Sequence, residues 1–105
     1  MSSIACVFPG QGSQHPEMLQ TDLVDQSFVN EKIEIVSEIL SYHVHSILED
    51  ESKLNATSFT QPLLVLSSAI FSEAYKNLSL SGPKVIAGHS LGEYSALMFA
   101  DSITF

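Results

Sequence analysis

The pentapeptide GHSLG, residues 88–92, most constrains what this chain can fold into. It follows the apolar run KVIAG and precedes EYSALMFA, residues 93–100, which favours a helix. A serine between two glycines at such a junction is typical of a strand that turns directly into a helix. The turn strains the backbone at the serine, and the glycines let the two elements pack closely because they lack a Cβ. The pattern therefore predicts that the Ser90 hydroxyl is exposed at a helix N-terminus.

This placement gives Ser90 a specific chemistry. Backbone N–H groups and the positive end of the helix dipole face any negative charge that develops beside the serine oxygen. The arrangement suits acyl transfer through an acyl-serine. The alternative for this motif alone is an ordinary strand-to-helix turn with a capping serine.

A second glycine-rich stretch, FPGQGSQ at residues 8–14, follows the apolar run IACVF, which fits a strand buried on both faces of a parallel sheet. Its sequence matches neither the phosphate loop with its lysine nor the G-x-G-x-x-G fingerprint. We expect it at the carboxyl end of the sheet, where Ser90 also lies. There a backbone N–H near Gln11 would approach an oxyanion over Ser90, together with the N–H of Leu91.

Helical periodicity fills the region between the two strands. Residues 28–48 carry apolar residues at steps of three or four, with a break near Tyr42. The apolar positions are Val29, Ile33, Val36, Leu40, Val44 and Ile47. The order of strand, helices, strand and helix predicts an α/β fold with a parallel sheet.

The stretch NATSFTQP, residues 55–62, is expected to be a polar connector. Thr60 would cap a helix that begins near Pro62 and runs to about Leu78, because proline is tolerated in a first helical turn. SLSGP, residues 79–83, would end that helix.

The charge balance narrows the range of partners. Twelve Asp and Glu residues face four lysines and no arginine, giving a formal net charge of −8. Such a chain repels nucleic acid and anionic membrane surfaces. No apolar run approaches the roughly 20 residues of a membrane span, and the first residues lack the features of a secretory signal. We therefore expect a cytoplasmic protein with no nucleic acid or membrane partner.

Metal and thiol chemistry are not expected. His43 and His45 lie about 200° apart around a helix and could not share an ion there. Together with His15 they are expected at the surface. The single cysteine, Cys6, lies in an apolar run and is expected to be a small buried core residue.

The motifs together resemble those of the malonyl-CoA:acyl carrier protein transacylases of fatty acid synthesis. The matching stretches are FPGQGSQ, TQP at residues 60–62 and GHSLGEYSAL at residues 88–97, and their spacing also matches. Acyltransferase domains of polyketide synthases share much of this pattern. The family moves a malonyl group from coenzyme A, with no bound cofactor, to the thiol of an acyl carrier protein through a malonyl-serine ester.

The resemblance implies a role for each matched residue. Ser90 would be the nucleophile, and the backbone N–H groups of Gln11 and Leu91 would form the oxyanion hole. The substrate-binding set would comprise Gln11, Gln61 lining the pocket, and His89, a structural neighbour that packs or hydrogen-bonds beneath the serine. No metal site is implied.

The resemblance also implies that residues 1–105 are a partial acyltransferase domain, truncated at the C-terminus. The fold would be the N-terminal part of an α/β-hydrolase-like parallel-sheet domain, without the family's ferredoxin-like subdomain. The family's catalytic histidine and its malonyl-binding arginine come later in its members, and this chain has no arginine. We therefore expect the chain to be inactive alone.

Two other classes of protein remain possible for this sequence. A serine hydrolase or thioesterase would share the serine turn, although its oxyanion loop usually reads like HGGG. A non-catalytic interaction fragment would keep the motif without the chemistry. An acidic carrier protein would be repelled by a chain of charge −8, so basic docking residues are expected in the missing part.

Overall fold

The computed structural model describes residues 5–78, 85–100 and 105. The prediction that residues 79–83 end a helix lies outside this part of the chain. The described helices and strands, in chain order, are β1 (Ala5–Phe8), α1 (Gln26–Leu40), α2 (Val44–Leu48), α3 (Glu51–Leu54), α4 (Thr57–Asn77), β2 (Val85–Gly88) and α5 (Gly92–Phe99).

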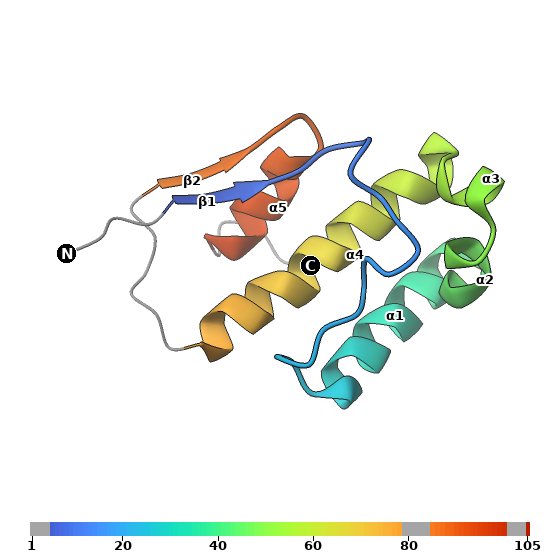
Figure 1. Ribbon diagram of the computed structural model, residues 1–105, viewed down its shortest axis with the longest axis horizontal. Coiled ribbons are helices and arrows are strands. Elements are labelled where there is room, and N and C mark those ends of the chain that lie inside the picture. Colours follow the sequence, from blue (N-terminus) through green and yellow to red (C-terminus); the bar gives the residue numbers. More distant parts are fainter. Residues whose placement is uncertain (1–4, 79–84, 101–104) are drawn as a thin grey trace.

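The two strands form a parallel pair, as predicted, in which Phe8 lies opposite Gly88. Figure 1 shows the pair along one side of the molecule, with α5 packed beneath it and the long helix α4 beyond. Because the strands are parallel and in register, the loops that follow β1 and β2 leave the sheet at the same end. The α/β class expected from the sequence is confirmed.

The hydrophobic core lies mainly between α4, α1, α2 and α3, and α4 forms its centre. Leu63, Leu66 and Ile70 are completely buried on α4, at steps of three and four residues. Val29, Ile33 and Val36 face them from α1. The segment before α1 is fixed to this core, because the Ser67 hydroxyl donates to the Met18 carbonyl at 2.7 Å.

The predicted break in the first helical region is confirmed. Ser41 adopts a left-handed conformation with φ of 58°, and this ends α1 before α2 begins at Val44. The amide of Tyr42 donates to the Ser37 carbonyl at 3.2 Å, which closes the last turn. Leu40 departs from the predicted apolar face and is 38% exposed, because α1 is already ending there.

The expected start of the next helix is wrong. Helix α4 begins at Thr57, so Pro62 lies inside it and most of the expected connector is helical. Thr60 is not a cap but is completely buried, and its hydroxyl donates to the carbonyls of Leu54 and Ala56. The single hydroxyl proton is thus shared between two carbonyls at the corner between α3 and α4, which favours helix through the polar stretch.

The sheet is covered on one face only. Phe8 is buried, and its ring meets that of Phe99 on α5 with centroids 5.6 Å apart. Val7 points the other way and is 71% exposed, so the expectation of a strand buried on both faces is wrong for this structure. Cys6 is half-buried rather than a core residue. Among the described residues, no helix is both long and apolar enough to cross a membrane.

Candidate active site

The Ser90 turn has the strained geometry that the sequence predicted. β2 ends at Gly88 and α5 begins at Gly92, so only three residues connect strand and helix. Ser90, at the centre, has φ of 54°, in the left-handed region that costs a non-glycine residue about 1–3 kcal/mol. Its side chain is exposed. Strain of this kind persists only where the surrounding structure enforces it.

The two flanking glycines supply that constraint. A Cβ on Gly88 would overlap the backbone of Gly92, and a Cβ on Gly92 would overlap the Phe8 carbonyl. Strand, turn and helix are therefore in backbone contact, and no larger residue fits at either position. This confirms the predicted reason for the glycines.

The loop after β1 meets the same turn. A Cβ on Gly10 would lie 2.7 Å from the His89 carbonyl oxygen and 3.6 Å from the Ser90 Cβ. The His89 amide also donates to the Phe8 carbonyl at 3.0 Å, which extends the pairing of the strands into the turn. The two glycine-rich motifs, about 80 residues apart in the sequence, thus converge as expected.

Most of the backbone amides that follow Ser90 are already used inside the turn and the first turn of α5. The Gly92 and Glu93 amides donate to the carbonyls of His89 and Ser90 at 2.9 and 3.0 Å. Across the described ranges, no backbone carbonyl accepts from the Gln11 or the Leu91 amide. These are the two donors that the sequence suggested for an oxyanion, and their role stays a prediction.

Side chains attach the loop after β1 to the corner between α3 and α4. Gln11 Nε2 donates to Thr57 Oγ1 at 2.9 Å, and Gln14 Nε2 donates to Asn55 Oδ1 at 2.8 Å. Gln61 is exposed and lies one helical turn after Thr57, on the same side of α4. The helix face that carries Gln61 is therefore the face that the loop contacts.

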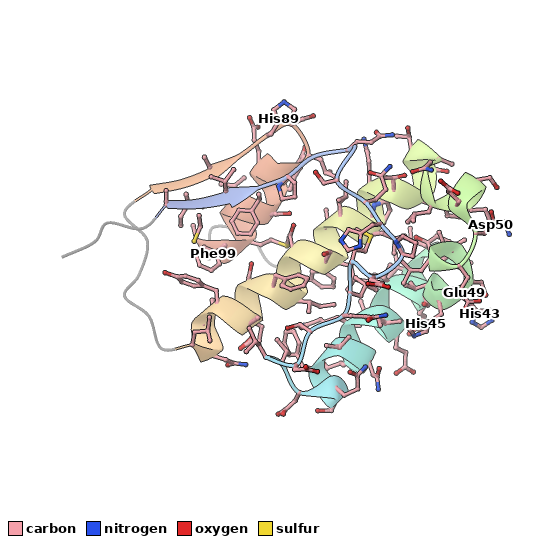
Figure 2. All side chains as sticks on the ribbon, viewed as in Figure 1. His43, His45, Glu49, Asp50, His89 and Phe99 are labelled. Carbon is pink, nitrogen blue, oxygen red and sulfur yellow. The ribbon has the colours of Figure 1, made fainter. Side chains whose placement is uncertain are left out.

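The four histidines do not gather at one site. His89 is exposed at the turn between β2 and α5, and Figure 2 shows its ring pointing away from the helices. The expectation that His89 packs or hydrogen-bonds beneath the serine is therefore wrong for this structure, since the side chain is exposed. His15 is exposed, as are His43 and His45 near α2, far from His89 in Figure 2. Among the described residues, no three metal-ligating side chains gather.

Sequence reasoning missed Gln14, Asn55 and Thr57. Their hydrogen bonds join residues 41 and 46 positions apart, which no local pattern reveals. The only sequence signal was that Gln14 ends the FPGQGSQ motif. The Ser90 side chain itself stands at an exposed surface.

Comparison with known proteins extends these observations. Residues 5–105 match the model of the acyl transferase domain family. The malonyl CoA-acyl carrier protein transacylase of Escherichia coli strain K12 is 37% identical over 107 aligned residues, which cover 100% of this chain and 35% of that protein. This chain therefore spans about a third of the length of the curated relatives that it matches.

Solved structures agree. The acyl carrier protein S-malonyltransferase of Vibrio cholerae superposes with a TM-score of 0.81 and 44% identity, covering 95% of this chain and 33% of that one. A malonyl-transacylase in complex with a type II PKS acyl-carrier protein gives a TM-score of 0.80 and 39% identity, covering 94% of this chain and 33% of that one. The observed arrangement of helices and strands is thus that of a third of these proteins.

Proposed function

The chain belongs to the acyl transferase domain family, and on this basis we propose that it is the N-terminal part of a malonyl-CoA:acyl carrier protein S-malonyltransferase of fatty acid synthesis. The observation that carries the proposal is the convergence of the Gly10 loop on the strained Ser90 turn. The similarity to malonyl transferases over the whole chain supports the substrate class.

In the proposed reaction, Ser90 Oγ attacks the thioester carbonyl carbon of malonyl-CoA and loses its proton to a base. The backbone N–H groups of Gln11 and Leu91 stabilise the oxyanion that forms, since these amides donate to no described carbonyl. Collapse of the tetrahedral intermediate breaks the carbon–sulfur bond, and coenzyme A leaves with the returned proton. A malonyl-serine ester remains.

The second half of the reaction repeats these steps with another thiol. The thiol of an acyl carrier protein loses its proton to the base and attacks the ester carbonyl, and the same two amides stabilise the new oxyanion. The ester carbon–oxygen bond breaks, and the proton returns to Ser90. By the family resemblance, the histidine base and the arginine that binds the malonyl carboxylate belong to the part of the relatives beyond the matched third.

Several finer points belong to the same proposal. Residues 1–105 would be part of one acyltransferase domain with an α/β-hydrolase-like sheet, and the reaction would take place in the cytoplasm without a bound cofactor. Gln61 would line the malonyl pocket, because its face of α4 carries the loop that contains Gln11. The net charge of −8 supports docking of the acidic carrier protein outside this region.

The test needs the downstream part of an enzyme. We define the complemented enzyme as this chain in place of the matched N-terminal region of the Escherichia coli relative. Incubation with malonyl-CoA, followed by intact-mass analysis, should show one added malonyl group, and Ser90→Ala should abolish it. Added acyl carrier protein should then receive the malonyl group. Folded complemented enzyme that stays unmodified would refute the proposal, and release of free malonate in place of transfer would indicate a hydrolase.

A further inference from the structure

The loop after β1 is held by a pair of side-chain amides that the reaction chemistry does not itself require. Gln14 bonds in two directions: Oε1 accepts from the Gly12 amide at 2.8 Å, and Nε2 donates to Asn55 Oδ1 at 2.8 Å. Its side chain thus joins the loop backbone to the residue at the end of α3.

The chemistry of these groups fixes their orientation. The Gly12 amide is a donor, so the Gln14 carbonyl oxygen must face it, and the Gln14 NH₂ must then face Asn55. Asn55 in turn must present its oxygen. The two hydrogen bonds therefore run in one direction, from the Gly12 amide to Gln14 and from Gln14 to Asn55.

Gly12 shows why the loop needs an external support. Its φ of +112° is a conformation that other residues rarely adopt, and a Cβ there would meet no atom within 4 Å. Glycine also has the largest backbone freedom of any residue, so an unsupported loop would sample many conformations. The Gln14 side chain accepts the hydrogen bond of this amide and thereby selects one of them.

The support itself rests on a rigid corner. Asn55 and Thr57 flank Ala56, whose carbonyl accepts from the buried Thr60 hydroxyl at 2.9 Å. Thr57 accepts from the Gln11 side chain at 2.9 Å, which adds a second attachment next to the first. The residue whose amide would bind the oxyanion is therefore held from both sides, by its own side chain and by the Gly12–Gln14 bond.

We propose that Gln14 and Asn55 are positioning residues, which hold the Gln11 amide over Ser90 through the Gly12 backbone. The inference rests on the proposed function, and it assigns to these two side chains a role in transition-state binding rather than in substrate contact. Interactions that serve only the transition state affect kcat, whereas the KM for malonyl-CoA should not change.

The first arm of the test uses the complemented enzyme. Gln14→Ala and Asn55→Ala should each lower kcat about tenfold, the value of one hydrogen bond, with KM within about twofold. Gln20→Ala is the matched control, because Gln20 is an exposed glutamine before α1 and outside the Gly12–Gln14–Asn55 hydrogen bonds, and kcat should not change. Rates are normalised to the fraction of enzyme that can be malonylated, so that a loss of folded protein is not mistaken for a lower kcat.

The second arm uses charge to separate positioning from packing. Asn55→Asp keeps the oxygen that accepts from Gln14, so activity should stay within about threefold of wild type. Gln14→Glu keeps the acceptor for Gly12, and the Asn55 amide can turn to donate to the new carboxylate, so it should also be tolerated. The double variant places two carboxylates face to face, and kcat should fall about tenfold or more because like charges repel. Packing of these two side chains without their hydrogen bonds would give no such pattern.

The third arm detects the hydrogen bond between the Gly12 amide and Gln14 without measuring catalysis. The amide proton shift of Gly12, followed by NMR in this chain and in the complemented enzyme, should move on Gln14→Ala and return towards wild type in Gln14→Glu. An unchanged Gly12 shift together with unchanged kcat in the alanine variants would overturn the proposal. If the wild-type complemented enzyme forms no malonyl-serine, the proposed function fails. In that case the Gly12 shift still tests the hydrogen bond, and an unchanged shift in Gln14→Ala overturns the positioning role by itself.

Discussion

The ring of Phe8, the last residue of β1, packs against the ring of Phe99, the last residue of α5, with centroids 5.6 Å apart. The ring of Tyr75 on α4 also packs against Phe99, with centroids 5.8 Å apart. Phe99 thus joins β1, which precedes the oxyanion loop, to α5, which follows Ser90. The position of the oxyanion loop relative to Ser90 therefore depends in part on a contact at the far end of α5.

Phe99→Ala should lower the free energy of unfolding by about 2–3 kcal/mol, less than for a fully buried ring because Phe99 is only half-buried. Urea unfolding followed by circular dichroism measures the change. Tyr94→Ala is the control on the same helix, since Tyr94 is 60% exposed and its loss should cost little. Equal effects of the two substitutions would contradict the role of the ring cluster.

Gly10→Ala tests the approach of the loop to the serine. The new Cβ would lie 2.7 Å from the His89 carbonyl oxygen, closer than real Cβ contacts come, so the loop must move away. In the complemented enzyme we expect malonylation of Ser90 to slow by about tenfold or more, because oxyanion stabilisation depends on donor position. Stopped reactions analysed by intact mass give the rate. Ser13→Ala, in the same loop and exposed, should react at the wild-type rate.

Thr60→Val tests the corner between α3 and α4. Valine has nearly the shape of threonine but lacks the hydroxyl that donates to the buried Leu54 carbonyl, so this carbonyl loses its partner, whereas the Ala56 carbonyl keeps the amides of Phe59 and Thr60. The free energy of unfolding should fall by about 1–3 kcal/mol. Thr60→Ser keeps the hydroxyl, so its free energy of unfolding should fall by less, about 1 kcal/mol for the lost methyl group. A larger loss in the serine variant than in valine would show that packing, not hydrogen bonding, holds this corner.

Asp50 gives a pH dependence with a defined sign. Its carboxylate accepts from the Ser52 hydroxyl and from the Lys53 amide, and these hydrogen bonds lower the pKa of Asp50 below its ordinary value of 3.8. A group whose pKa is lower in the folded state stabilises the fold above its unfolded pKa, and this contribution is lost as the pH falls through the folded pKa.

We therefore expect wild type to lose more stability than Asp50→Asn between pH 6 and pH 3, because asparagine can cap α3 but does not titrate. Thermal unfolding across this pH range compares the two proteins. Parallel curves for wild type and Asp50→Asn would show that the Asp50 cap carries none of the acid sensitivity.

The sequence alone determined the parts of this protein that depend on local constraints. Glycines at 88 and 92 implied contact between strand and helix, and the structure leaves no space for a Cβ at either position. The strain at Ser90 follows from the same contact. Apolar spacing also located α1, α2 and the break between them, because helical periodicity is written into neighbouring residues.

Tertiary structure decided what depends on distant partners. Helix α4 begins before Pro62 because the Thr60 hydroxyl finds buried carbonyl acceptors, which no propensity reveals. The bond between Gln14 and Asn55 joins two polar loops that look unremarkable in sequence, and the exposure of Val7 and His89 depends on what packs over each face. Hydrogen bonds and burial between segments far apart in the chain set these features, so only the folded chain fixes them.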